Sequence, residues 1–295
     1  ILAGGRKGTT QAQVLWTLRL PRVWMGLLAG GALGLAGGVY QTLFGNPLAS
    51  PDLTGVASGA SLGAACAIVL GAGTSAQIMG GAFLMGMASL VLVLALVRWA
   101  GLERTGTYIL AGVIISSAAD AGLMVLKTVA DPEGELAAIE FWTMGSLAAM
   151  TADKVWPAAA AILIPALLIF LFRQRLLILS MGEESARTMG LAPGPWRSLL
   201  LGLTTLMVAA VVSVAGVVAF VGLIAPHIAF LLLGRRGGPY LPLCALVGGD
   251  ILLAADLLAR SLAGGGELPL SIWTVCFGVP VLLALLVGQR GGRDG

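Results

Sequence analysis

The sequence predicts an all-α, polytopic membrane protein with about nine transmembrane helices. Hydrophobic residues make up 58% of the 295 residues and charged residues only 11%, whereas a soluble domain carries roughly 25% charged residues. Apolar segments of near-bilayer length recur along the chain, and its 43 glycines suit helices that pack closely through small residues. We therefore expect residues 1–295 to form a single transmembrane domain.

Nine apolar segments are long enough, or nearly so, to cross a hydrocarbon core that takes about 20 helical residues. In chain order they cover residues 22–44, 55–72, 78–97, 108–129, 155–172, 197–214, 216–234, 241–262 and 268–287. The apolar run 199–233 is too long for one span, so we expect the chain to turn back near residues 214–216. Segments that Gly and Pro interrupt are tolerated only where their backbone is buried in protein or lines a cavity. The stretch 137–150 is too short to span and is expected to form a partial helix on the outer side.

A polar, helix-forming island at residues 180–197 separates two of the apolar segments. Glu183 and Glu184 would occupy the first turn of its helix, where carboxylates favour the positive end of the helix dipole. Arg187 follows Glu184 by three residues, so the two can pair on one face. Residues expected to end and stop this helix come next: Gly190, Pro193 and Pro195. A short capped helix between two spans has no membrane role of its own, which indicates a surface held by a soluble partner.

The basic residues cluster near the ends of the predicted spans and indicate an orientation. Under the positive-inside rule the larger group is expected in the cytoplasm: Arg98, Arg104, Arg173, Arg175, Arg187, Arg197, Arg235, Arg236, Arg290 and Arg293. The smaller group then faces outward: Arg6, Lys7, Arg19, Arg22, Lys127, Lys154 and Arg260. This orientation places the polar island in the cytoplasm, where ATP is, and the acidic loop 131–140 outside. An outer N-terminus without an initiator Met or a signal-peptide pattern leads us to expect that one earlier span is absent.

Several kinds of site are not expected from the sequence. The three cysteines lie in apolar runs and His227 is the single histidine, so neither a disulfide framework nor a multi-histidine metal site is predicted. His227 is interpreted as a structural, hydrogen-bonding residue. A Walker A or similar phosphate-cradling motif is absent, so we expect no bound cofactor and no ATPase activity in this chain.

Two alternative functions come from other classes of protein. An ion-coupled secondary transporter would depend on ionisable residues in the apolar segments: Asp120, Asp250 and Asp256. The capped polar island argues against it, because such a transporter needs no soluble partner. An intramembrane aspartyl protease is not favoured, because Val247 stands where a G-x-G-D pattern requires glycine.

Six motifs in order resemble the FecCD-type permeases, which are membrane subunits of type II ABC importers for iron-siderophores, haem and vitamin B12. They are LRLPR (18–22), FGNPLASPDLTGVASGASLG (44–63), GEESARTMGL (182–191), FVGLIAPHIAFLLLG (220–234), LLAADLLAR (252–260) and ELPLSIWTVCFGVPVLL (267–283). Family members have ten spans with both ends in the cytoplasm, and this chain matches spans two to ten.

The resemblance implies a function and a set of partners. The chain would be a permease of the bacterial inner membrane that passes a bulky metal chelate from a periplasmic binding protein to the cytoplasm. Iron-siderophore is the expected cargo because it is the commonest class in the family, with haem and vitamin B12 as alternatives. The partners would be a second permease copy or fused half, and two ATP-binding subunits that hold ATP and Mg.

The resemblance also assigns contact residues at both ends of the spans. The coupling helix held by the ATPase subunit corresponds to Gly182, Glu183, Glu184, Ala186, Arg187, Met189, Gly190 and Leu191. Its charged residues would contact the partner, and Ala186, Met189 and Leu191 would be apolar anchors. Arginines expected to receive carboxylates of the binding protein are Arg19, Arg22 and Arg260. Lipid-headgroup anchoring is the alternative for these arginines, and Asp256 is placed to pair with Arg260.

Gate and pathway residues are assigned in the same way. The inner gate corresponds to Asn46, Leu48, Thr105 and Gly106. Ordinary turn chemistry is the alternative for each of them, because Asn-Pro and Thr-Gly are common turn formers. The Gly-, Ala- and Ser-rich segment 55–64 is interpreted mainly as a helix-packing surface. Ser58 and Ser61 are expected to be its pore-facing exceptions.

Overall fold

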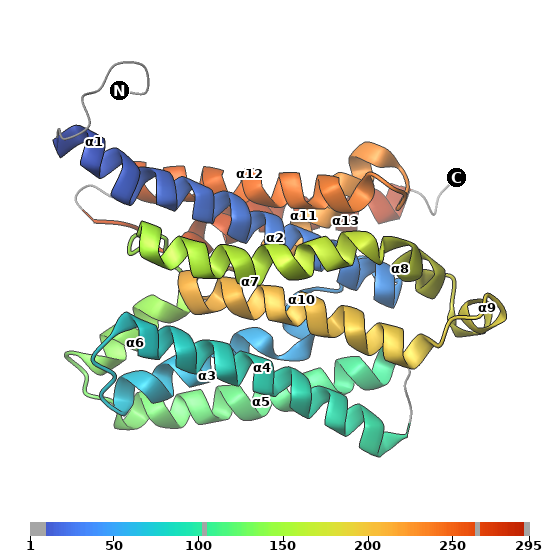
Figure 1. The fold of residues 1–295 in the computed structure, drawn as a ribbon, viewed down its shortest axis with the longest axis horizontal. Coiled ribbons are helices and arrows are strands. Elements are labelled where there is room, and N and C mark those ends of the chain that lie inside the picture. The colour runs from blue at the N-terminus through green and yellow to red at the C-terminus, as the bar shows by residue number, and fades with distance from the viewer. Residues whose placement is uncertain (1–9, 102–104, 263–265, 292–295) are drawn as a thin grey trace.

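The computed structural model describes residues 10–101, 105–262 and 266–291, and these residues form a helical bundle (Figure 1). Nine helices match the predicted spans: α2 (Leu20–Phe44), α3 (Val56–Val69), α4 (Ser75–Ala100), α5 (Thr105–Val129), α7 (Ala152–Leu171), α10 (Pro193–Ala215), α11 (Val221–Leu233), α12 (Tyr240–Ser261) and α13 (Leu270–Gly291). Shorter elements connect or extend them: α1 (Thr10–Val14), the π-helix η1 (Leu15–Arg19), the 3₁₀-helix η2 (Pro51–Thr54), α6 (Glu135–Thr143), α8 (Arg173–Ser180) and α9 (Glu183–Thr188).

The predicted fold class is confirmed: the chain is an all-α, polytopic membrane protein. Six helices in the described part are long and apolar enough to cross a membrane, and α3 and α11 are shorter apolar helices of 14 and 13 residues. The predicted reversal near residues 214–216 is confirmed, because α10 ends at Ala215 and Gly216 follows with a positive φ of 71°. The partial helix expected within 137–150 is also present, as α6.

Helix α2 is the central element of the bundle. Most of its residues are buried, and it packs against α7, α10, α11 and α12. Three of its glycines face other backbones: a Cβ at Gly30 or Gly34 would collide with carbonyl groups of α12, and one at Gly37 with Gly222 of α11. This glycine face lets the three backbones approach closely, which is how membrane helices gain packing without a hydrophobic driving force.

Two non-helical stretches precede the short helices. One runs from Gly45 to η2 and leads into α3, and the other, residues 216–220, leads into α11. Backbone groups around the second stretch have partners: Ser146 N donates to the Ala215 carbonyl at 2.8 Å, and Ser271 Oγ donates to the Val217 carbonyl at 3.0 Å. Irregular backbone of this kind is tolerated between spans because protein surrounds it.

The polar island differs from its prediction at one boundary. Pro193 and Pro195 do not stop the preceding helix; they lie in the first turn of α10. Proline fits this turn because the first helical N–H groups have no intrahelical partner to lose. Helix α8, which the sequence analysis did not assign, leads into the island. In Figure 1, α8 and α9 lie at one end of the molecule and α1 and α6 at the other.

Gly34→Ala is expected to lower the free energy of unfolding by about 1–3 kcal/mol, because the new methyl group would push α2 away from the Cys244 carbonyl. Gly202→Ala on α10 is the matched control, since its Cβ would meet open space within the described structure. Thermal unfolding of both detergent-solubilised variants checks this expectation. Equal melting temperatures would show that the α2–α12 contact is not tight.

Candidate functional site

Helix α9 is a six-residue helix bounded by glycines that adopt positive φ. Gly182 precedes it with φ +100° and Gly190 follows it with φ +77°, conformations that favour glycine. Glu183 and Glu184 occupy its first turn and Arg187 its last, as the helix dipole favours. The predicted helix start and the predicted end at Gly190 are therefore confirmed.

The two faces of α9 have different environments. Glu184, Arg187 and Met189 are exposed. Ala186 and Leu191 are buried in the core of the chain, so they attach this element to its own fold. The expectation that Ala186 and Leu191 anchor a partner is therefore wrong, and Met189 is the apolar side chain that remains available.

An ion pair joins α9 to α10. Glu183 Oε1 accepts a hydrogen bond from Arg197 Nη1 at 2.8 Å, and the Arg197 side chain is only 5% exposed. The expected Glu184–Arg187 pair is not among the ion pairs of the described residues. The helix spacing permits that pair, but both side chains point to solvent, where such a contact stabilises little.

The predicted gate residues lie at the ends of α2 and α5. Asn46 Oδ1 accepts a hydrogen bond from Leu48 N at 2.9 Å, which is the turn chemistry that Asn-Pro favours, and Leu48 is 62% exposed. Gly106 is exposed in the first turn of α5, while the Thr105 side chain lies outside the described residues.

The small residues of α3 pack mainly against α4. Gly59 and Gly63 face Ser89 and Gly81 of α4 at distances that leave no room for a Cβ. Ser61 is buried and donates to the Ala57 carbonyl at 2.9 Å, so its predicted exposure to a pore is wrong. Ser58 is half-buried. The packing interpretation of this segment is confirmed.

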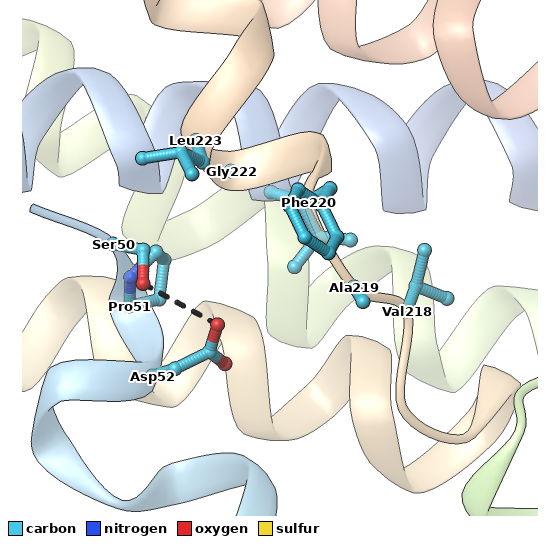
Figure 2. Close-up of a pocket in the computed structure, with 9 residues that line it drawn as sticks. Ser50, Pro51, Asp52, Val218, Ala219, Phe220, Gly222 and Leu223 are labelled. Carbon is cyan, nitrogen blue, oxygen red and sulfur yellow. Dashed lines mark hydrogen bonds between the residues drawn. The ribbon is translucent and has the colours of Figure 1, made fainter. Parts of the chain in front are cut away.

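A cavity of about 140 Å³ lies between the two non-helical stretches (Figure 2). Its lining comes from α2, from both stretches and from the start of α11: Leu33, Ser50, Pro51, Asp52, Val218, Ala219, Phe220, Gly222 and Leu223. Phe220 has φ +68°, the one positive φ outside glycine among the described residues, so this wall carries backbone strain.

The one acid in this lining is Asp52. Dense surroundings raise the pKa of the Asp52 carboxyl although its side chain is open to the cavity, and the Ser50 hydroxyl, 3.3 Å from Oδ2, opposes that shift. The carboxyl is therefore ionised less readily than a surface aspartate.

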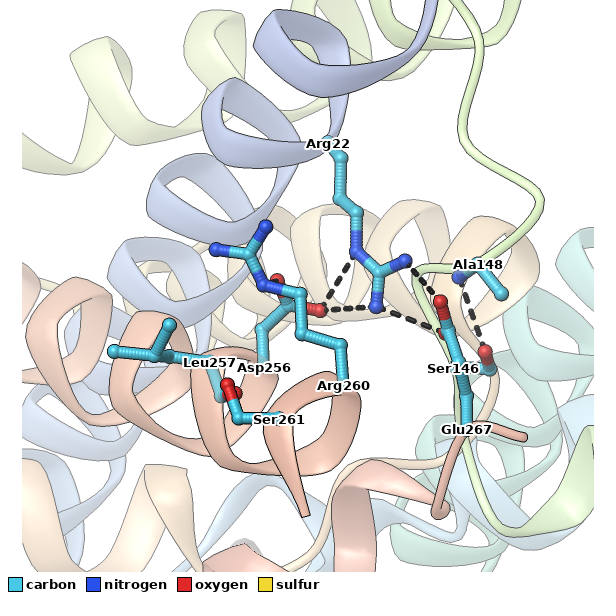
Figure 3. Close-up of polar contacts among 8 residues, drawn as sticks. All are labelled: Arg22, Ser146, Ala148, Asp256, Leu257, Arg260, Ser261 and Glu267. Atoms are coloured by element: carbon cyan, nitrogen blue, oxygen red, sulfur yellow. Dashed lines mark hydrogen bonds and ion pairs between the residues drawn. The ribbon is translucent and has the colours of Figure 1, made fainter. Parts of the chain in front are cut away.

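At the end of the bundle where α2 begins, Arg22 joins three segments through two carboxylates (Figure 3). Its Nε and Nη2 donate to Asp256 Oδ1 at 2.9 and 2.7 Å, and its Nη1 and Nη2 donate to the Glu267 carboxylate at 2.6 and 2.9 Å. The side chains of Arg22 and Asp256 are 13% and 2% exposed. Bidentate contacts of this kind fix α2, α12 and the segment before α13 in register.

Of the three predicted docking arginines, two remain accessible. Arg19 is exposed, and Arg260 is 41% exposed, with its Nε 3.7 Å from Asp256 Oδ2. The predicted Asp256–Arg260 pair is confirmed as this longer contact. Arg22 is held inside the protein by Asp256 and Glu267, so it is a structural residue in this conformation. Glu267 was missed, and its place at the start of the ELPLS motif was the available signal.

The other ionisable residues of the spans are arranged differently. Lys127 of α5 pairs with Glu140 of α6 at 2.9 Å, a contact that the sequence analysis did not find. Asp250 is exposed on α12 and Asp120 is half-exposed on α5. His227 is buried in α11. Within the described ranges, no three His, Cys, Asp or Glu side chains come together as metal ligands.

Arg22→Met is expected to destabilise the protein by about 3–5 kcal/mol, because it leaves the buried Asp256 carboxylate without its main partner. Arg260→Met, the matched control four residues from the same carboxylate, is expected to cost less than about 1 kcal/mol. Thermal unfolding in detergent measures both. A larger loss for Arg260→Met would reverse the assignment of the structural arginine.

Known proteins of similar sequence and structure cover nearly the whole chain. It is 36% identical over 280 residues to the vitamin B12 import system permease protein BtuC of Klebsiella pneumoniae, covering 94% of this chain and 83% of that protein. It is 39% identical over 277 residues to BtuC of Salmonella typhimurium, covering 92% and 83%.

Two solved structures resemble the fold. One is an inward-facing conformation of a metal-chelate type ABC transporter, with a TM-score of 0.89 and 33% identity, covering 97% of this chain and 91% of that one. PsaBC from Streptococcus pneumoniae, in complex with Fab, has a TM-score of 0.65 at 21% identity over 93% of each chain, a likeness of fold alone. The model of the FecCD transport family matches residues 2–288, and the chain is a member of that family.

Proposed function

We propose that this chain is the membrane permease subunit of a type II ABC importer that passes a bulky metal chelate from an external binding protein to the cytoplasm. The observation that carries the proposal is α9, a charged helix fixed on one face by Ala186 and Leu191 and exposed on the other. A helix attached to the fold in this way can transmit the movement of a soluble partner to the rest of the chain. The family membership and the named BtuC relatives support the same function.

The proposed assembly has two permease copies, two ATP-binding subunits and one binding protein. ATP and Mg would be held by the ATP-binding subunits, which contact Glu184, Arg187 and Met189. Helix α5 is the least buried of the six long spans, so it offers an apolar face to a second copy. The binding protein would dock at the outer end through Arg19 and Arg260. The proposed setting is the bacterial inner membrane.

In the proposed mechanism, ATP biases an equilibrium between two gate states. Binding of ATP closes the ATPase dimer and moves α9, and the segments that carry Asn46, Leu48 and Gly106 rearrange. The free energy comes from the different affinity of ATP for the two states, since a ligand shifts an equilibrium only by its differential affinity. The cavity beside Asp52 lies next to the gate segment that ends in η2.

For the cargo, we propose a corrinoid of the vitamin B12 type. The support is that the relatives at 36–39% identity are named vitamin B12 permeases. Iron-siderophore, the cargo expected from frequency in the family, is the second candidate, because the structural neighbour at 33% identity is described by the broader metal-chelate class.

The partner assignment is tested by purifying the tagged chain gently from membranes. The wild-type chain is expected to carry a stoichiometric ATPase subunit. Charge reversal by Glu184→Lys with Arg187→Glu is expected to reduce that yield at least about tenfold, because both side chains are exposed on α9. Arg98→Glu, at the exposed end of α4, is the matched control and is expected to retain the subunit. Full retention by the double variant would refute the assigned contact.

The cargo is tested by uptake of labelled cyanocobalamin into proteoliposomes that contain the complete importer, with the binding protein outside and ATP inside. Excess unlabelled cyanocobalamin is expected to abolish uptake, while ferric siderophore and haem leave it unchanged. Uptake of ferric siderophore in place of cyanocobalamin would move the assignment to the second candidate. Uptake that needs an ion gradient and no ATP would favour the secondary transporter, with Asp120, Asp250 and Asp256 as its candidate ion-coupling residues.

A further inference from the structure

Arg197 is a buried charged residue at the start of α10. It is 4% exposed, between the short helix α9 and the beginning of α5. A charged side chain is rarely buried this completely unless specific partners hold it. The partners of Arg197 therefore indicate its role.

The first partner is Glu183 of α9. The Arg197 Nη1–Glu183 Oε1 distance is 2.8 Å, and the Glu183 side chain is 39% exposed, so it lies at the boundary between the fold and the surface of α9. Among the described residues, this ion pair joins α9 to the spanning helix α10. A displacement of α9 therefore acts directly on the Arg197 guanidinium.

The second partner is Tyr108 of α5. The Arg197 Cζ lies 5.8 Å from the centroid of the Tyr108 ring, and Tyr108 is 2% exposed. Tyr108 is two residues after Gly106. The Tyr108 ring also lies 6.4 Å from that of Phe44, the last residue of α2. Asn46 follows Phe44 by two residues, so these rings lie beside both gate segments.

The contacts continue inward from Phe44. Its ring lies 5.7 Å from that of Tyr40, whose hydroxyl is 3.1 Å from Thr54 Oγ1 of η2 and 3.5 Å from Thr205 Oγ1 of α10. These side chains are buried, and η2 also lines the cavity beside Asp52. A continuous set of packed side chains thus runs from the surface of α9 to the non-helical stretch before α3.

We infer that Arg197 is a positioning residue that transmits the movement of α9 to the two gate segments through Tyr108 and Phe44. The inference rests on the proposed function, since it takes α9 as the helix that the ATPase subunit moves. It adds a residue outside the predicted coupling and gate sets. Arginine suits this place because its planar guanidinium binds a carboxylate at its edge and an aromatic ring on its face, which a lysine ammonium does not do equally well.

The test separates coupling from assembly in the reconstituted importer. Arg197→Lys is expected to retain the ATPase subunit and its ATP hydrolysis, because Arg197 is buried and the exposed contacts of α9 stay in place. The amount of solute transported per ATP hydrolysed is expected to fall about tenfold. The matched control is Arg175→Lys: the exposed Arg175 of α8 stacks on Trp196, the residue before Arg197, with its Cζ 5.0 Å from the ring centroid. It is expected to keep the wild-type ratio.

Other outcomes overturn the inference. If transport and hydrolysis fall together, in proportion to the folded protein measured by thermal unfolding in detergent, Arg197 has only a structural role. If Arg197→Lys keeps the wild-type ratio, the transmission does not pass through this ion pair. If the wild-type chain carries no ATPase subunit at all, the proposed function fails first, and this readout is separate from the transport ratio.

Discussion

The close approach of the α2 backbone to α11 and α12 is the constraint on which the rest of the structure depends. In a membrane, helices do not gain from hiding apolar surface from water, so contact between backbones through small residues replaces that driving force. Gly30, Gly34 and Gly37 make this contact on three successive turns of one helix. This contact fixes the start of α11, which forms one wall of the cavity beside Asp52.

The two ends of the bundle use buried arginines in a similar way. Arg22 binds Asp256 and Glu267 at one end, and Arg197 binds Glu183 and stacks on Tyr108 at the other. Each guanidinium joins segments that are distant in sequence. Their carboxylate partners differ in exposure: the Asp256 side chain is 2% exposed, whereas those of Glu267 and Glu183 are 33% and 39% exposed. The Arg22–Asp256 pair is therefore enclosed by the protein, while the Arg197–Glu183 pair borders the exposed surface of α9.

Hydropathy predicted the fold well, because span length and apolar composition are local properties of the chain. Contacts between distant segments could not be predicted in this way. Charge spacing within one helix indicated Asp256–Arg260, but the shorter contact joins Arg22 to Glu267, 245 residues away. Proline chemistry is also ambiguous in sequence, since Pro193 begins a helix where it was expected to stop one. Small residues such as Ser61 suit a pore or a helix contact equally, and only the burial of the side chain in the folded chain decides between them.

The charge balance around Arg22 has a consequence for association rates. Arg22 and Arg260 contribute two positive charges, and Asp256 and Glu267 contribute two negative charges, so these four residues sum to zero. A neutral patch exerts little long-range attraction on an acidic protein. Dissolved salt, which screens such attraction, therefore has little effect on it. Encounter with an acidic partner at this patch should therefore depend weakly on ionic strength. Recognition of a partner there would come from short-range contacts. Arg19 is the nearby positive charge that Asp256 and Glu267 do not offset.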